Sequence, residues 1–285
     1  MKTDEGGPEA LATRVLSGGR GAAESRQHQA AREFAERLGA RRRDAGAPVR
    51  TIFVSDERTG RPTLARLLSG SAAGGGGRGG QLRVKLYVSL LWVCAKKPHD
   101  VARPARAWAA LLGLPDPEGR GVRRVQQTFR ELEERQLVRL EDRGGLPTRV
   151  FVLSEKGDGR AYHPAPDAHS ALQRRRVDDE VLREHRYFRV PSSLWTGGHI
   201  AKLSGPGLAM LLALLSERRG QTEPSVWFSP ARATARFGFA ASTRSQGLAE
   251  LRELELLRTT VRTVSEDGAY IDFARRRSVH ELIGL

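Results

Sequence analysis

The sequence reads AWAALLG from Ala107 to Gly113 and RGVRRVQQTFRELEERQ from Arg120 to Gln136. The first segment predicts a short helix that ends at Gly113, because glycine readily adopts the left-handed conformation that closes a helix. The second segment has apolar residues at helical spacing and predicts an amphipathic helix. Its inward residues are Val122, Val125, Phe129 and Leu132. A short helix, a turn and a longer basic helix are therefore expected in succession.

Two short apolar segments follow this basic helix. Residues 137–141 and 149–152 alternate or pair apolar side chains around Gly144-Gly145. Strand-forming segments on either side of a glycine turn predict a two-stranded β-hairpin.

The same order of elements is predicted a second time, over about residues 230–273. Ser229 is a helix-capping residue, Pro230 suits the first helical position, and Gly238 ends that helix. A longer helix is expected over residues 241–257, with Leu248 and Leu251 facing inward. A second hairpin is expected from residues 259–264 and 269–273, which flank Asp267-Gly268.

Both copies resemble the winged helix-turn-helix fold. The segment from Tyr187 to Leu194, followed by Leu203-Ser204 and a leucine-rich helix, is similar to the entry into winged-helix domains of plasmid replication initiators. The resemblance covers about residues 81–274 and rests on apolar spacing, which tandem winged-helix transcription regulators also match. It implies two winged helices in tandem, one binding repeated DNA sites and one serving a second half-site or dimerisation.

The predicted fold class is mainly α with small β-wings, an α+β chain with two winged-helix domains and a partly disordered N-terminal extension. Glycine and polar residues dominate the ends of the first 80 residues, and such segments cannot bury enough apolar surface to order. The expected organisation is a flexible extension over 1–80 with a helix near 22–43, a first winged-helix domain over 81–163, a linker over 164–184 and a second domain over 185–285.

The chain is strongly basic. Lysine and arginine number 48 against 33 aspartates and glutamates, which gives a formal net charge of +15 and a pI near 11. The excess is shared by both predicted domains, as expected for nucleic-acid-binding modules. The alternative is arginine-rich codon usage, since only six of the 48 cations are lysine.

The basic helix carries the predicted DNA contacts of the first domain. With the apolar residues inward, arginine and glutamine side chains face outward, and these can bond guanine, adenine and phosphate. The helix-turn-helix resemblance puts this helix in the major groove, while the hairpin arginines suit minor-groove or phosphate contact. An ordinary solvated helix face is the alternative. The predicted residues are Arg120, Arg123, Arg124, Gln127, Arg130, Arg143 and Arg149.

The second domain offers a different surface. The outward residues expected on helix 241–257 are Ser242, Ser245, Gln246, Ala249 and Glu253, and they include no cation. This domain is therefore expected either to hold phosphates or to form a dimer surface. The predicted phosphate contacts are Arg232, Arg236, Arg244 and the run Arg275-Arg276-Arg277.

Catalytic, metal and cofactor sites are not predicted. The glycines at 75, 77 and 80 fit a dinucleotide-binding pattern but lie in a glycine tract without the required strand. The seven histidines have no carboxylates at metal-ligand spacing, and Asp178-Asp179-Glu180 beside three arginines indicates a charged linker face more simply than a metal site. The single cysteine, Cys94, lies in an apolar run and is expected to be buried.

The sequence thus predicts a cytoplasmic, non-enzymatic protein that binds double-stranded DNA sequence-specifically, without cofactor or metal. No apolar segment reaches the roughly 18 residues of a membrane-crossing helix. Expected partners are double-stranded DNA, a second copy of the chain, and replication or transcription machinery, but no membrane. An initiator-like role is favoured. A transcriptional regulator and a winged-helix assembly protein that does not bind DNA are the alternatives.

Overall fold

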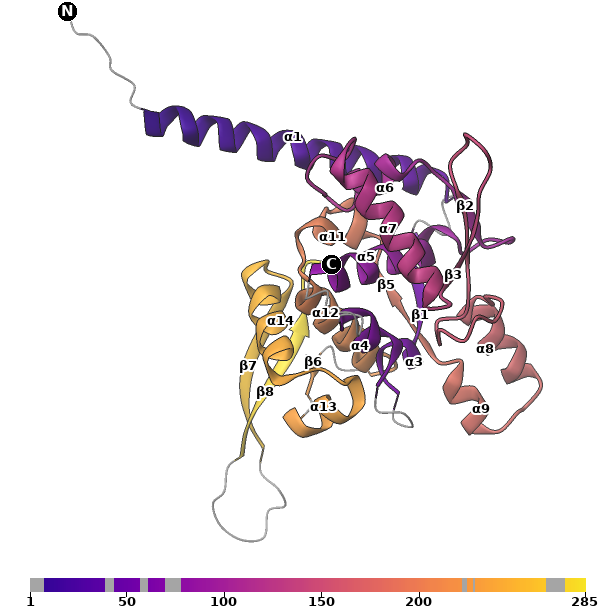
Figure 1. Cartoon of the computed structure of the whole chain (residues 1–285). Coiled ribbons are helices and arrows are strands. Elements are labelled where there is room, and N and C mark those ends of the chain that lie inside the picture. Colours follow the sequence, from indigo (N-terminus) through magenta and orange to yellow (C-terminus); the bar gives the residue numbers. More distant parts are fainter. Residues whose placement is uncertain are drawn as a thin grey trace, which may run out of the picture.

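The computed structural model describes residues 8–38, 44–56, 61–69, 78–221, 225–227, 229–264 and 275–285 (Figure 1). Within these residues, helices are combined with one two-stranded and two three-stranded antiparallel sheets, which confirms a mixed α+β fold. No helix in the described part of the chain is both long and apolar enough to cross a membrane.

The first repeated unit contains three helices and a three-stranded sheet. Leu112 caps α6, and Gly113 follows with a φ of 64°. Helix α7 buries Val125, Phe129 and Leu132, while Val122 is only half-buried. In the sheet, β4 lies between β2 and β3. The elements are α5 (Arg78–Val93), β2 (Asp100–Ala102), α6 (Ala105–Leu111), α7 (Arg120–Glu134), β3 (Val138–Glu141) and β4 (Arg149–Val152).

The second unit repeats this order. Ser204 caps α12 by accepting a hydrogen bond from the Gly207 amide, and Ser229 caps α13 by accepting one from the Arg232 amide. Gly238 ends α13 with a φ of 65°. The central strand is again the last one, because β8 lies between β6 and β7. The elements are α12 (Gly205–Arg218), β6 (Ser225–Val226), α13 (Pro230–Phe237), α14 (Ala241–Glu253), β7 (Leu257–Val264) and β8 (Arg275–Leu282).

The second hairpin differs from its prediction. The strand expected at residues 269–273 lies outside the described residues, and β7 pairs instead with β8, which begins at Arg275. The preceding helix ends at Glu253, and Leu257 already belongs to β7. Strand β7 therefore starts two residues earlier than predicted, and the arginine run 275–277 lies within the sheet.

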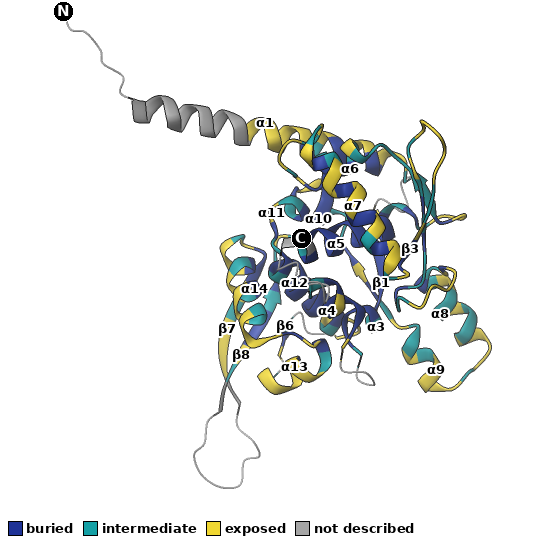
Figure 2. Cartoon of the chain, in the orientation of Figure 1, coloured by how far each residue is buried: buried dark blue, intermediate teal, exposed yellow. Residues whose placement is uncertain are grey.

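The two units share one hydrophobic core. Helix α12 is buried over nearly its whole length because it is apolar on all sides, and it packs against both α5 and α14. Helices α7, α5, α12 and α14 follow one another across the molecule, so α7 and α14 lie on opposite sides of the central pair (Figure 1). Figure 2, in which residues are coloured by burial, shows that α5 and α12 at the centre of the molecule are mostly buried.

The N-terminal 80 residues contribute to this core where they are described. Helix α1 (Pro8–Glu36) packs on α6, with the rings of Phe34 and Trp108 4.7 Å apart. Strand β1 (Ala47–Arg50) pairs with β5 (Tyr187–Val190), and α3 (Thr51–Val54) follows directly. Helix α4 (Thr63–Leu68) packs on α5. The extension was expected to be flexible, but parts of α1, α3 and α4 are packed, because Phe34, Phe53 and Leu64 insert into the core.

The segment between the units is also ordered. Residues 164–184 were expected to form a linker with one short helix, and they form α8 (Ala165–Arg174) and α9 (Asp179–Glu184). Two short helices, α10 (Ser193–Thr196) and α11 (His199–Lys202), precede α12. Arg50 in β1 forms a buried ion pair with Glu155, which follows β4, and donates to the His163 carbonyl at 2.6 Å.

Candidate nucleic-acid interface

The outward face of α7 brings five predicted residues together. Arg123, Arg124, Gln127 and Arg130 are exposed, and the side chain of Arg120 retains 82% of its accessible surface. These residues cover the first three turns, whereas Glu131, Glu133 and Glu134 occupy the last turn. The cations are therefore concentrated at the N-terminal part of the helix.

The N-terminus of α7 is closed by Asp116. Its carboxylate accepts hydrogen bonds from the amides of Gly119 at 3.1 Å and Arg120 at 2.8 Å. The Arg120 amide is the main reason why the pKa of Asp116 lies below its ordinary value. Because Asp116 occupies these amides, an anionic ligand at α7 would be bound by the arginine side chains.

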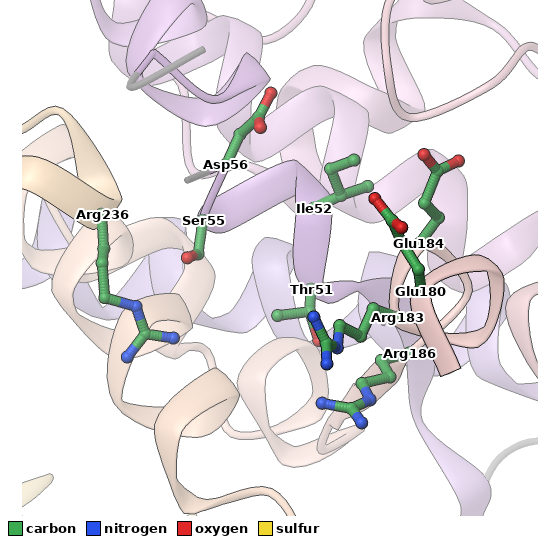
Figure 3. A pocket seen from close by; sticks show the side chains of 9 residues that line it. All are labelled: Thr51, Ile52, Ser55, Asp56, Glu180, Arg183, Glu184, Arg186 and Arg236. Atoms are coloured by element: carbon green, nitrogen blue, oxygen red, sulfur yellow. The ribbon is translucent and has the colours of Figure 1, made fainter. Parts of the chain in front are cut away.

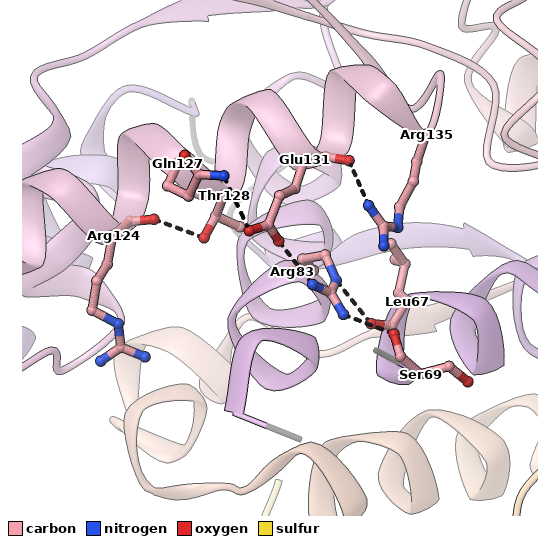
Figure 4. Close-up of polar contacts among 8 residues, drawn as sticks. All are labelled: Leu67, Ser69, Arg83, Arg124, Gln127, Thr128, Glu131 and Arg135. Atoms are coloured by element: carbon pink, nitrogen blue, oxygen red, sulfur yellow. Dashed lines mark hydrogen bonds and ion pairs between the residues drawn. The ribbon is translucent and has the colours of Figure 1, made fainter. Parts of the chain in front are cut away.

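A buried arginine fixes α7 against the N-terminal region. Arg83 on α5 is 5% exposed and donates to the carbonyls of Leu67 at 3.0 Å and Ser69 at 2.8 Å. Its third contact is an ion pair with Glu131 of α7 at 2.8 Å (Figure 4). Gln127 lies 3.4 Å from the same carboxylate. The end of α4 thus helps to position the helix that carries the basic face.

The β3–β4 hairpin holds the two remaining residues predicted in the first unit. Arg143 is exposed in the loop. Arg149 instead forms an ion pair with Asp100 of the neighbouring strand, and this hydrogen bond is the main cause of its raised pKa. Arg139 and Arg149 both lie over the ring of Phe151, with their guanidinium carbons 3.9 and 5.0 Å from its centre. Arg143 is therefore freer to reach a ligand than Arg149.

The arginines predicted on the helices of the second unit differ in their exposure and in their partners. Arg232 is exposed on α13. Arg236 pairs with Glu217 of α12 at 2.9 Å. Arg244 is half-buried on α14 and donates to the Pro230 carbonyl at 3.2 Å.

Arg236 also borders a hollow of about 260 Å³ between α3, α9 and α13 (Figure 3). The backbone N–H of Asp56 donates a hydrogen bond to the carbonyl oxygen of Arg236, with 3.3 Å between the two atoms. Acidic and basic side chains line this hollow together, including Glu180, Arg183 and Arg186. The mixture does not favour an anionic ligand there.

Arg244 borders a larger groove that the sequence did not indicate. This groove has a volume of about 780 Å³ and also contains Trp227, Arg252 and Arg277. Arg244, Leu248 and Arg252 are four residues apart, so their common helix face was a usable signal. The sequence could not place Trp227 and Arg277 at that helix face, because neither belongs to α14. Trp227 follows β6, and Arg277 lies in β8.

Comparison with known proteins gave no relative: neither a protein-family model, nor a curated protein, nor a solved structure matches this chain.

Proposed function

We propose that both repeated units are winged helices and that the protein binds double-stranded DNA sequence-specifically through α7. The supporting observation is the exposed basic face on the third helix of a helix–strand–helix–helix–strand–strand unit. In winged-helix proteins the third helix enters the major groove. Arg123 and Gln127 would contact base edges, and the neighbouring arginines would neutralise phosphates.

The second unit supports the same function less directly. Helix α14 exposes Arg252 near its end, whereas its first exposed residues are uncharged or small. The first unit is therefore the proposed site of sequence recognition. Arg232 and Arg143 would contribute phosphate contacts from the two units.

A salt series with the full-length protein tests duplex binding. Affinity for a duplex should fall steeply as salt rises, because phosphate neutralisation releases counterions. Arg123→Ala and Gln127→Ala should relax the selected sequence motif, with each lost base contact costing roughly 1–3 kcal/mol. Arg175→Ala removes an exposed arginine after α8 and is the matched control. An unchanged motif in the α7 variants, or a flat salt response, would reject the proposal.

Within this function we propose an initiator-like role, supported by the tandem arrangement of two such units. The alternative is transcriptional regulation with the same contacts. Genome-wide recovery of bound DNA separates them: repeated sites beside an origin support initiation, and scattered promoters support regulation. The absence of any enriched site would favour an assembly role without DNA recognition.

A further inference from the structure

The groove of the second unit, which Arg244 borders, takes no part in the proposed binding of duplex DNA through α7. It lies between α14, strands β7 and β8, and the segment from Trp227 to Pro230. Arg244 and Arg252 approach from the helix, and Arg277 approaches from β8. Three arginines from two different elements therefore converge on one recess.

The charge of the groove is of one sign. Its described lining contains three arginines, Arg244, Arg252 and Arg277, and no aspartate or glutamate. Burial, followed by the nearby charge of Arg252, lowers the pKa of His280 below its ordinary value. The remaining polar lining consists of hydroxyl groups. An anionic ligand with hydrogen-bond acceptors is the chemistry that this lining fits.

Trp227 adds an exposed aromatic surface to the groove. The other three tryptophans of the chain are at most 1% exposed, whereas Trp227 is 38% exposed. The guanidinium carbon of Arg277 lies 4.3 Å from the centre of the Trp227 ring system. An exposed indole beside a stacked guanidinium is the arrangement that binds nucleic-acid bases by stacking.

The exposed ring of Trp227 favours the binding of unpaired nucleic acid over the binding of a duplex. In a duplex each base is covered on both faces by its neighbours, so it cannot stack on a protein side chain without leaving the helix. An unpaired base can stack on an aromatic ring at once, and its phosphates then follow a basic groove.

We propose that this groove binds an unpaired segment of nucleic acid. One base extends the stack of Arg277 and Trp227, and Arg244 and Arg252 bind the flanking phosphates. This site is separate from the α7 surface, so the same chain can bind duplex DNA and a single strand on opposite sides of the α5–α12 pair.

The test uses the full-length protein and a labelled oligo(dT) of about twelve nucleotides, a length within the site sizes known for single-strand binders. Trp227→Ala should weaken binding about tenfold, which corresponds to the loss of one stacked base. Trp227→Phe should retain most of the affinity. Arg252→Gln should weaken binding, whereas Arg175→Ala, an exposed arginine outside the groove lining, should not.

Iodide quenching of tryptophan fluorescence gives an independent measurement. Trp227 should dominate the quenchable signal, and saturating oligo(dT) should protect it. Oligo(U) in parallel distinguishes the two sources of unpaired strand: equal affinity assigns the groove to both, and a preference assigns it to the preferred one. Unchanged oligo(dT) affinity in Trp227→Ala, or equal protection of Trp227 by a blunt duplex, would overturn the proposal.

The same variants separate this proposal from the proposed function. Trp227→Ala should leave the duplex motif selected by α7 unchanged, and Arg123→Ala should leave oligo(dT) affinity unchanged. Loss of duplex recognition without loss of oligo(dT) binding would reject only the role of α7. Circular dichroism of Trp227→Ala and Trp227→Phe establishes that both variants are folded.

Discussion

Trp92 and Trp195 stack face to face, with ring centres 4.5 Å apart and an interplanar angle of 5°. Trp92 belongs to α5 of the first unit, and Trp195 lies in α10, on the segment that leads into the second unit. The Trp195 indole N–H also donates to the Ser89 hydroxyl of α5 at 2.8 Å. The two units are therefore joined by core packing, and fragments that contain one unit would expose the face that the other covers.

This stack should be a main determinant of stability. Trp195→Ala removes a fully buried ring and leaves a cavity, so we expect a loss of about 3–5 kcal/mol in the free energy of unfolding. Urea unfolding followed by circular dichroism measures the change. Trp227→Ala is the matched control, and it should change stability by only about 0.5 kcal/mol because this ring is partly exposed. Equal losses in the two variants would contradict the shared core.

Glu250 links α14 to the start of α12. Its carboxylate accepts hydrogen bonds from the Ser204 amide at 2.5 Å and from the Ser204 hydroxyl. Glu250→Ala removes both bonds, so we expect a loss of about 2 kcal/mol. A Cβ at Gly207 would overlap the same carboxylate, so Gly207→Ala should act by displacing it. In a double-mutant cycle, Gly207→Ala should therefore cost less in the Glu250→Ala background. Strict additivity would show that Gly207 and Glu250 act independently.

Local sequence patterns predicted the helices and caps well. The apolar spacing of Val125, Phe129 and Leu132 places them on one face of a helix, and the structure confirms their burial. Ser229 and Gly238 mark the ends of α13 because capping depends on a few neighbouring residues. Cys94 is buried, as its apolar surroundings indicated.

Contacts between distant residues could not be predicted in the same way. Val49 in β1 pairs with Phe188 in β5, but neither short segment alternates clearly enough to specify its partner or register. Strand β2 has three residues and was missed. Burial of Phe34 and Leu64 likewise depends on α6 and α5, which are remote in sequence. The ion pairs of Arg149 with Asp100 and of Arg236 with Glu217 arise only from the assembled sheets and helices.

The hairpin arginines should differ in their contribution to DNA binding. Arg143→Ala removes an exposed cation, so the slope of log affinity against log salt should fall by about 0.9 if Arg143 contacts one phosphate. Arg149→Ala should change this slope less, because its guanidinium already pairs with Asp100. It should instead lower the melting temperature, since the Asp100 side chain is only 10% exposed and would lose its cation. Duplex binding across a salt series and thermal unfolding measure the two effects. A larger slope change in Arg149→Ala would reverse this assignment.

Lys85 should make stability depend on pH. It lies on α5 with 2% of its surface exposed, and its ammonium group donates to the Ala201 carbonyl at 3.0 Å. Burial lowers its pKa from 10.5 to about 8, although the charge of Glu250 opposes the shift. Between pH 8 and 10.5 the unfolded chain binds more protons at this site than the native protein does, so this residue's contribution to stability should rise with pH. The shift corresponds to about 3 kcal/mol across this window, and below pH 8 the penalty should be constant.

Lys85→Met tests this dependence, because methionine fills a similar volume and does not titrate. Urea unfolding of the wild type and the variant at pH 7.5, 8.5 and 9.5 gives the difference in free energy of unfolding at each pH. The wild type should gain stability relative to Lys85→Met as pH rises, by roughly 1.4 kcal/mol for each pH unit well inside the window. Lys96→Met removes an exposed lysine and is the matched control variant. The contrary result is that the free energies of unfolding of wild type and Lys85→Met change with pH in parallel. Lys85 would then have the same pKa in the native and unfolded protein, because water reaches its ammonium group in the native protein.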